Sequence, residues 1–337
     1  MSWKIQIKKS GHEFQVEEGE SVLTAALRQN IGLPYGCRNG NCGSCRATLL
    51  EGEVDYGDHL PSVLSVDEMA ENDVILCQAR PKTDLVIDAD ELQVVAGLQP
   101  RIMPCRVTRI EKLTDDVIAL SLKLPQNQQL KYLAGQYIDI LLTGGKRRSY
   151  SLAHAPDTMD ELELHVGYVE GGLFTSHVFE KMKERELLRF NGPLGSFFIR
   201  GEIEEPIILV AGGTGYAPIQ AMIEQWIAGN DSREVHFYMG ARRPGDLYMH
   251  QQCLQWEKEH ERFHYTPVLS ALAPEDKWEG ETGWIQDRIL KDFGNLEGFQ
   301  LYTAGPPVMV HALKKELVKA GLRPHRMFYD SFEYAAQ

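Results

Sequence analysis

Long apolar runs and basic side chains are both scarce in this sequence of 337 residues, and each shortage excludes a class of protein. No run approaches the roughly 18 consecutive apolar residues that a membrane-spanning helix needs. Met1–Gln15 alternates apolar and polar side chains, which predicts strands and not a cleaved leader. Lysine and arginine number 35 against 48 acidic residues, and the net charge of −13 argues against nucleic acid as the main ligand.

The length predicts two or three domains. We expect a cytoplasmic protein that binds neither membranes nor nucleic acids. In that compartment thiols stay reduced and remain available to a metal. Six cysteines are present, and their spacing is the first positive signal.

Four cysteines follow the pattern C-x4-C-x2-C with a distant fourth: Cys37, Cys42, Cys45 and Cys77. This is the plant-type spacing for a [2Fe–2S] cluster, in which three ligands come from one loop. Gly36, Gly40 and Gly43 suit such a loop, because they permit positive φ and bring amides close to sulfur. A structural zinc site and disulfides are the alternatives, and zinc sites usually show two C-x2-C pairs. We expect Cys105 and Cys253 to be plain buried thiols.

The elements around the cysteines predict a small first domain over residues 1–92. Gly36–Cys45 contains G-C-R-x-G-x-C-G-S-C, and together with the element order it is similar to the β-grasp ferredoxins. Eight basic and sixteen acidic side chains give residues 1–92 a net charge of −8. Such a surface either steers a partner protein toward the cluster or is ordinary solvation. The expected elements are strands 3–8, 13–17, 46–51 and 84–88, a helix capped by Ser21 that ends near Asn30, and a short helix near 66–71.

Two further domains are expected after a linker at 93–103. Short strands at 105–111, 117–122, 136–142, 148–152 and 162–168 predict an antiparallel β-barrel over 104–203. From 204 to 337 strands alternate with helices, which predicts a parallel α/β sheet. The predicted fold class is therefore multidomain, α+β and α/β.

The barrel contains the pattern R-x-Y-S at Arg148–Ser151. On a strand, Arg148 and Tyr150 point to one face, where a guanidinium can bind phosphate and a ring can stack on a flavin. Ser151 can bond a ring nitrogen. The alternative is an ordinary basic strand end.

A glycine pair predicts a pyrophosphate site next in the chain. Gly171 and Gly172 precede a helix whose free amides, with the Thr175 hydroxyl, can hold phosphate oxygens. His165 and Val166, on the strand that leads into this turn, are included among the cofactor-binding residues.

The order R-x-Y-S, G-G-x-x-[ST] and G-P-x-G-x-F, the last at Gly192–Phe197, resembles the ferredoxin–NADP reductase superfamily over all of 104–337. The resemblance implies that Arg148 binds flavin phosphate, that Tyr150 packs on the isoalloxazine and that Ser151 approaches its reactive nitrogen. It favours FAD over FMN.

A second glycine-rich turn follows an apolar strand and opens a helix. The family pattern G-G-T-G-x-[AS]-P implies NAD(P)H binding there. Arg242 and Arg243 follow the next strand, where they can meet a 2′-phosphate, but an exposed basic turn is equally consistent. NADH and NADPH both stay open, and the family resemblance favours NADH. Ala304 stands where many family members have cysteine, before Gly305 and Pro306. The residues expected in the turn are Gly212, Gly213, Thr214, Gly215 and Pro218.

The tail Phe328–Glu333 resembles the family's C-terminal segment that lies over the flavin. Asp330 and Phe332 are its candidate catalytic residues, together with Tyr150 and Ser151. A simple terminal strand is the alternative for Asp330.

Taken together, these parts imply a reductase that takes two electrons from NAD(P)H onto FAD and passes them singly through the cluster to a partner protein docked near it. Leu33–Gly40, Leu133–Asp139 and Tyr329–Phe332 resemble the CDP-6-deoxy-Δ3,4-glucoseen reductases, which serve a pyridoxamine-dependent dehydrase. Reductase components of aromatic-ring and methane-type oxygenases are also very similar. A free-flavin reductase is another alternative, and a non-catalytic zinc-binding interaction protein would leave R-x-Y-S and G-G-T-G unexplained.

Overall fold

The computed structural model describes residues 1–57 and 60–333, and its contacts divide the chain into two compact units. The first unit is Met1–Arg101 with Pro193–Phe197, and the second begins at Ile102 and takes the rest of the described chain. Within the described ranges, no helix is long and apolar enough to cross a membrane.

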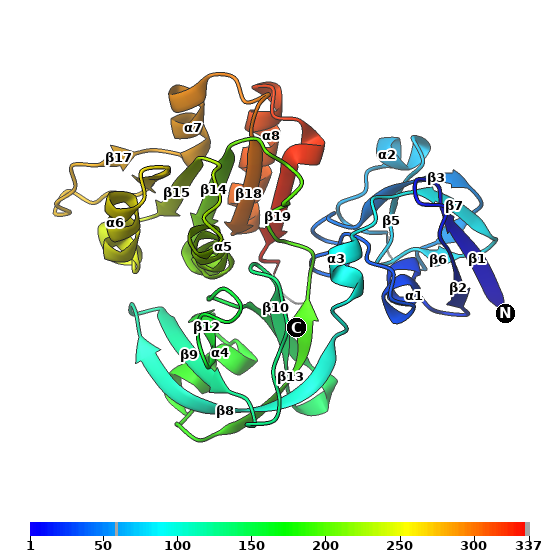
Figure 1. Cartoon of the computed structure of the whole chain (residues 1–337), viewed down its shortest axis with the longest axis horizontal. Helices are drawn as coiled ribbons and strands as arrows, with labels where there is room; N and C mark the ends of the chain where they lie inside the picture. Colours follow the sequence, from blue (N-terminus) through cyan, green and yellow to red (C-terminus); the bar gives the residue numbers. More distant parts are fainter. Residues whose placement is uncertain (58–59, 334–337) are drawn as a thin grey trace. The chain divides into compact units, whose positions relative to one another are not determined.

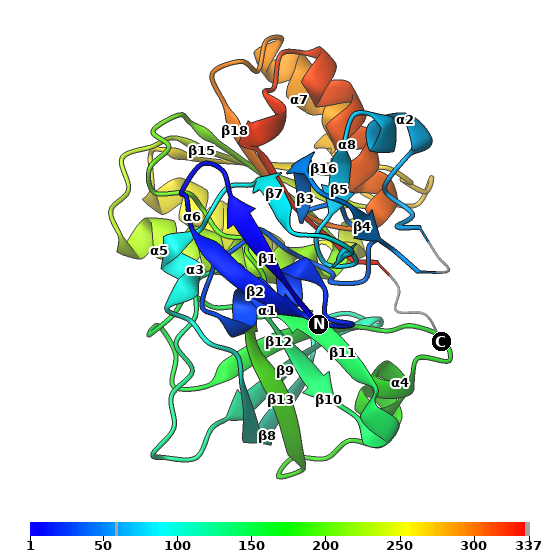
Figure 2. The same ribbon diagram turned by 90° about the vertical axis from the view of Figure 1, so that its right-hand side faces the viewer.

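The first unit is built on a five-stranded mixed sheet in the order β2-β1-β7-β3-β5 (Figure 1). β1 pairs antiparallel with β2 and parallel with β7, and Figure 2 shows the β1–β2 hairpin with α1 beside it. The Ser21 side chain accepts from the Thr24 amide at the start of α1, as its position before an apolar run predicts. The elements are β1 (Ser2–Ile7), β2 (Glu13–Glu17), α1 (Val22–Arg28), β3 (Arg46–Glu51), β4 (Val54–Asp55), α2 (Val66–Ala70), β5 (Asp73–Ile75), β6 (Arg80–Pro81), β7 (Leu85–Asp88) and α3 (Gln93–Ala96).

The second unit begins with a six-stranded antiparallel sheet in the order β11-β10-β13-β8-β9-β12. A bridge between Leu152 and Leu164 joins its two edges, which closes the predicted barrel. Side chains such as Ile138, Leu120 and Phe190 fill the barrel core. The elements are β8 (Arg101–Lys112), β9 (Val117–Lys123), β10 (Tyr137–Leu141), β11 (Arg147–Ser151), β12 (Leu162–Gly167), α4 (Leu173–Glu180) and β13 (Leu187–Leu194).

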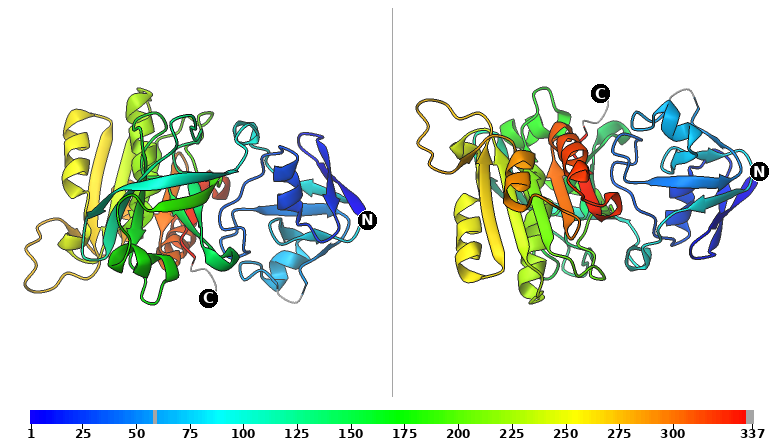
Figure 3. Two further views of the ribbon diagram at one scale, coloured as in Figure 1. Left: turned by 90° about the horizontal axis from the view of Figure 1, so that it is seen from below. Right: turned by 90° about the horizontal axis from the view of Figure 1, so that it is seen from above.

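The remainder of the second unit is a six-stranded parallel sheet in the order β17-β16-β15-β14-β18-β19. Ile208 and Val210 of β14 pack with α7 and α8 on one face, and α5 and α6 lie on the other (Figure 3). The elements are β14 (Ile207–Gly212), α5 (Tyr216–Ala228), β15 (Val235–Ala241), α6 (His250–Glu259), β16 (Phe263–Leu269), β17 (Glu281–Thr282), α7 (Ile285–Phe293), β18 (Gln300–Gly305), α8 (Pro307–Lys319) and β19 (Met327–Ser331).

Sequence patterns predict the fold class and most elements correctly, with two differences. The segment 93–103, expected to lack regular structure, contains α3 and the first residues of β8. The motif Gly192–Phe197 begins inside a strand, because β13 continues through Leu194, and Gly195 follows directly with a φ of 90°. The Gly192 Cβ position lies 2.6 Å from a methyl group of Ile138 on β10, so close strand packing and not turn geometry requires glycine there.

Candidate functional site

The four predicted cluster ligands come together as two pairs. The Cys42 amide donates to Cys37 Sγ at 3.3 Å, and the Cys37 amide donates to Cys42 Sγ at 3.4 Å. Cys77, in the turn after β5, forms the second pair with Cys45, and each of the two side chains is the largest influence on the pKa of the other. Except for the half-buried Cys37, these sulfurs are buried.

Each pair contains one sulfur that favours the thiolate form. The Cys42 thiol and the amides of Asn39 and Cys42 donate to Cys37, which lowers the pKa of Cys37 to about 6. The Cys45 thiol and the Gly40 amide likewise lower the pKa of Cys77. The pKa values of Cys42 and Cys45 are raised, because each donates its proton to a partner and is buried. The loop therefore directs N–H groups at sulfur, as a cluster of anionic thiolates requires.

The pairing separates the two metal alternatives. Within the described chain, no three cysteine sulfurs lie within 4.8 Å of one another. A single tetrahedral zinc ion with Zn–S bonds of about 2.3 Å would hold all four sulfurs about 3.8 Å apart. Two irons that each take two thiolates keep the pairs apart, so Cys37, Cys42, Cys45 and Cys77 fit a [2Fe–2S] cluster.

The glycines of the cysteine loop follow the prediction at two positions of three. Gly40 and Gly43 have φ of 83° and 81°. The expectation of positive φ at Gly36 is wrong, and Arg38 takes that conformation instead with φ of 60°. Gly36 is needed for space, because a Cβ there would lie 3.3 Å from both Cys42 Sγ and Ser44 Oγ.

The flavin pattern places Arg148 and Tyr150 on one face of β11, opposite Ile140 and Ile138 of β10. The Tyr150 ring lies 5.3 Å from Phe174 in the first turn of α4, so this face and the start of α4 lie together. Arg148 donates to the carbonyl of Arg147 and forms no ion pair with a described carboxylate. A guanidinium without a described carboxylate partner, on the strand face whose Tyr150 contacts the start of α4, fits a phosphate-bearing flavin.

The predicted pyrophosphate turn is tightly closed. Thr175 Oγ1 donates to the Val169 carbonyl at 3.1 Å and accepts from the Val169 amide at 3.3 Å, so this hydroxyl folds the turn. A Cβ on Gly172 would lie 2.3 Å from Thr175 Oγ1, and Gly171 has a φ of 68°. Thr175 thus shapes the loop whose amides face a phosphate, which adds a structural role to the predicted binding role.

His165 and Val166 of β12 lie inside the protein. Val166 belongs to the barrel core. The His165 side chain is fully buried, with Nε2 3.3 Å from Glu163 and Nδ1 3.2 Å from the Tyr248 hydroxyl. Tyr248 in turn donates to the Gly213 carbonyl at 3.5 Å. His165 therefore links the barrel to the nucleotide turn, and its predicted direct contact with a cofactor stays a prediction.

The predicted nucleotide turn lies where β14 ends. Gly213 has a φ of 54°, and Pro218 lies in the first turn of α5. Gly215 faces β18, where an added Cβ would lie 2.1 Å from the Ala304 carbonyl oxygen. Gly305, followed by the exposed Pro306, faces Gly212, whose carbonyl oxygen would lie 2.6 Å from an added Cβ. These glycines let the two strand ends meet under a nucleotide site beyond the carboxyl edge of the sheet.

The turn also meets the flavin barrel. A Cβ on Gly167 would lie 3.3 Å from the Thr214 methyl group. Ser151 at the end of β11 donates to Asp330 Oδ2 of β19 at 3.4 Å. Asp330 pairs with Ala304 across the sheet, and the Phe332 amide donates to the Gly305 carbonyl. Asp330 therefore lies in a terminal strand, β19, that brings it to Ser151, and the catalytic role expected for Asp330 and Phe332 stays a prediction.

Sequence analysis missed a buried charge cluster between the barrel and α5. His154 Nδ1 lies 2.9 Å from Glu224 of α5, and its Nε2 lies 3.4 Å from Glu163 of β12. Burial by itself lowers the pKa of His154, but its hydrogen bonds with both carboxylates outweigh this and raise it to about 9. The sequence gives no signal for this cluster, because His154 and Glu224 are 70 residues apart and no local motif links them.

This cluster predicts a loss of stability in alkali. A histidine whose pKa in the folded protein exceeds its unfolded value of about 6.5 adds to the free energy of unfolding. This contribution is complete below pH 6.5 and disappears as the pH rises through the folded pKa. Between pH 6.5 and 9.5 we expect the free energy of unfolding of the wild type to fall by about 3 kcal/mol more than that of His154→Gln. This figure follows because each unit of pKa shift corresponds to about 1.4 kcal/mol. Urea unfolding at both pH values measures this. Equal losses in the two proteins would contradict it.

Three family models match the chain at the places that the geometry indicates. The 2Fe-2S iron-sulfur cluster binding domain matches 5–82, the oxidoreductase FAD-binding domain 104–199 and the oxidoreductase NAD-binding domain 209–315. The cofactors are therefore a [2Fe–2S] cluster, FAD and a nicotinamide nucleotide.

Relatives extend the likeness over the whole chain. It is 36% identical to a CDP-6-deoxy-L-threo-D-glycero-4-hexulose-3-dehydrase reductase of Yersinia pestis, over 98% of this chain and 99% of that one. It is 32% identical to the phenol hydroxylase P5 protein of Acinetobacter pittii, over 100% and 96%. The crystal structure of the Amycolatopsis cytochrome P450 reductase GcoB matches with a TM-score of 0.79 at 31% identity, covering 98% of both chains. The chain belongs to the family of iron–sulfur flavoprotein reductases, in which electrons pass from NAD(P)H through FAD to a [2Fe–2S] cluster.

Proposed function

We propose that this reductase delivers electrons to a dehydrase that acts on a CDP-linked 6-deoxy-hexulose. The observation that carries the proposal is the full-length likeness, at 36% identity, to the reductase of such a dehydrase. An oxygenase component is the second candidate, since the phenol hydroxylase relative matches over the same length at 32%. We place the protein in the cytoplasm, where cluster thiols stay reduced.

Bound flavin supplies the exchange between a two-electron hydride donor and one-electron transfer. The chain's own residues prepare that exchange. We assign to Arg148 and the start of α4 the binding of phosphate, to Tyr150 the packing of the ring, and to Ser151 with Asp330 the orientation of the reacting edge. The hydrogen bond of 3.4 Å between Ser151 and Asp330 supports the last assignment. Phe332, held by its amide at Gly305, is assigned to cover the ring and exclude water.

A direct comparison of acceptors tests the proposal. The purified holoenzyme with NADH is supplied either with a CDP-6-deoxy-hexulose dehydrase and its sugar substrate or with a phenol hydroxylase oxygenase component and phenol. We expect reduced sugar to accumulate and phenol to stay unchanged. Hydroxylation without sugar reduction would transfer the assignment to the oxygenase class and leave the reductase activity intact.

We propose that the acceptor docks beside the cysteine loop. The segment 60–62 lies against this loop, because a Cβ on Gly40 would lie 3.3 Å from Pro61 and Ser62 donates to Asn41 at 3.0 Å. Leu60 at the start of that segment is 57% exposed. A single exposed apolar side chain is ordinary on a protein surface, so we choose Leu60 for its position beside the cysteine loop.

Leu60→Arg should therefore slow electron delivery to the protein acceptor about tenfold, the effect of losing about 1.4 kcal/mol at an interface. Reduction of ferricyanide by NADH should not change, since this small acceptor needs no docking surface. Leu50→Arg is the matched control, because Leu50 is 47% exposed on β3. Equal rates for the Leu60 and Leu50 variants would place docking elsewhere.

We propose that NADH is the preferred nucleotide. The loop after β15 carries Arg242 and Arg243, and in open α/β sheets this position faces the adenosine ribose. Arg243 is neutralised by two carboxylates, Asp276 Oδ1 at 2.7 Å and Glu275 Oε1 at 3.0 Å. A 2′-phosphate placed here meets these two acidic groups together with a guanidinium that is already paired.

The double change Glu275→Gln with Asp276→Asn should raise kcat/KM for NADPH relative to NADH roughly tenfold, because it frees the Arg243 charge without removing side-chain volume. Steady-state rates with both nucleotides measure the ratio. The control is Glu316→Gln, which breaks an exposed ion pair with Lys319 on α8. A ratio that stays at the wild-type value in the double variant would refute the assignment.

A further inference from the structure

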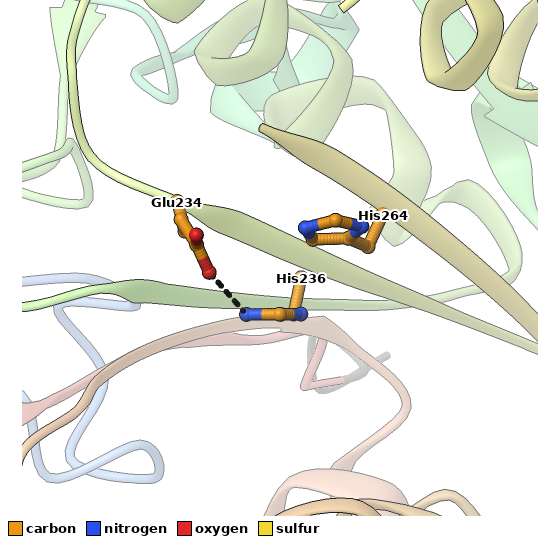
Figure 4. A group of neighbouring side chains, drawn as sticks. All are labelled: Glu234, His236 and His264. Atoms are coloured by element: carbon orange, nitrogen blue, oxygen red, sulfur yellow. Dashed lines mark ion pairs between the residues drawn. The ribbon is translucent and has the colours of Figure 1, made fainter. Parts of the chain in front are cut away.

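One cluster of metal-binding side chains in the described chain lies outside the cofactor sites. His236 of β15 and His264 of β16 are direct partners in the parallel register, and Glu234 immediately precedes β15. One ligand atom from each of the three residues lies within 4.8 Å of the other two. Figure 4 shows the Glu234 carboxylate and one nitrogen of each ring on the same side of the group.

The two rings lie face to face. They stack with centroids 4.8 Å apart and an angle of 20° between their planes, so the exposed His264 ring has to turn before both in-plane lone pairs can reach the same ion. Phe293 and Phe299 pack against the edge of the His236 ring. The His236 Nε2 lies 3.6 Å from Glu234, and among the described residues neither imidazole has another hydrogen-bond or ion-pair partner.

The chemistry of the two imidazoles also suits a ligand. A neutral imidazole offers the lone pair that a metal ion takes. Ordinary aromatic packing accounts for the position of His236, but it does not explain why the Glu234 carboxylate also lies beside the two imidazoles.

We propose that Glu234, His236 and His264 form a binding site for a divalent transition-metal ion of the zinc type, with water as the remaining ligand. Two imidazoles and one carboxylate are a donor set that zinc accepts, whereas calcium and magnesium require oxygen ligands.

The geometry allows the site to close. Zinc bonds to nitrogen and oxygen of about 2.0–2.2 Å with tetrahedral angles require ligand atoms about 3.3–3.6 Å apart. The donors here lie within 4.8 Å of one another, so they have to approach by up to about 1.5 Å. Glu234 and His264 are exposed and can rotate, while His236 is held by the phenylalanines. Their exposure also leaves the remaining position open to water.

The location indicates what the ion does. Glu234, His236 and His264 lie at the amino ends of β15 and β16, and the nucleotide turn lies at the opposite, carboxyl edge. The ion therefore joins two neighbouring strands without touching the electron path. We expect it to stabilise the nucleotide-binding sheet and to leave NADH-dependent turnover unchanged.

Equilibrium dialysis of the oxidised holoenzyme against micromolar zinc chloride, with zinc and iron measured by emission spectroscopy, tests the site. We expect one zinc ion per chain with unchanged iron content, and binding at least about tenfold weaker in His264→Ala and in Glu234→Gln. His12→Ala is the matched control, because His12 pairs with Glu91 at 2.8 Å without a third ligand.

Thermal unfolding gives a second measurement. Zinc should raise the midpoint of the wild type and of His12→Ala but not that of His264→Ala. Equal zinc uptake by the wild type and His264→Ala, or zinc uptake accompanied by loss of iron, would overturn the proposal. Neither measurement depends on the identity of the electron acceptor.

Discussion

Replacing Cys77 by alanine should abolish electron delivery to the protein acceptor while NADH still reduces ferricyanide. Of the four cysteines that we expect to bind the cluster, Cys77 lies outside the loop 37–45, and it pairs with Cys45. Without it, one iron keeps a single protein thiolate, and the cluster cannot be held. The flavin and nucleotide residues belong to the other unit of the chain and do not depend on this sulfur.

Iron and sulfide analysis, visible absorbance and both activities measure the effect. We expect a preparation that retains flavin but has lost iron. Cys105→Ala is the matched control, since Cys105 is equally buried and burial raises its pKa to about 12, which makes it an inert thiol. A Cys77→Ala protein that kept its iron and its acceptor activity would show that the cluster has another fourth ligand.

The sequence identifies this cluster because its determinants are local. Three ligands fall within nine residues, and two of the three glycines behave as the loop requires. Gly36 differs because a close approach to Cys42 and a positive φ both select glycine, and the sequence cannot tell them apart. The capped helix at Ser21 and the turn at Gly212–Gly215 are predictable for the same reason: each depends on neighbours in the chain.

What the sequence does not disclose depends on pairs that are far apart. His154 pairs with Glu224, and Arg243 pairs with Asp276, which lies 33 positions further along the chain, because the fold brings their elements together. Single charged residues on strand ends and helices look alike in sequence, whether they end in solvent or in a buried pair. Asp330 is intermediate, since a family resemblance indicates its role but only the pairing of β18 with β19 shows how it reaches Ser151.

Gly215→Ala should severely reduce both nucleotide binding and the stability of the parallel sheet. A methyl group at this position would lie 2.1 Å from the Ala304 carbonyl oxygen and 2.4 Å from its carbon. These atoms belong to the backbone of β18, whose partner β14 runs into the glycine turn, so neither can rotate away. Relief requires the ends of two central strands to separate, at a cost of about 3 kcal/mol or more.

Urea unfolding and the KM for NADH measure the two effects, and both should change together because the same displacement opens the turn. Two other glycines separate the clash from the mere loss of glycine. Gly213→Ala has open space and only the strain of a φ of 54°, about 1 kcal/mol, and Gly298→Ala has open space without that strain. If Gly215→Ala were no worse than Gly213→Ala, the close contact between the ends of β14 and β18 would not be what holds the nucleotide turn in shape.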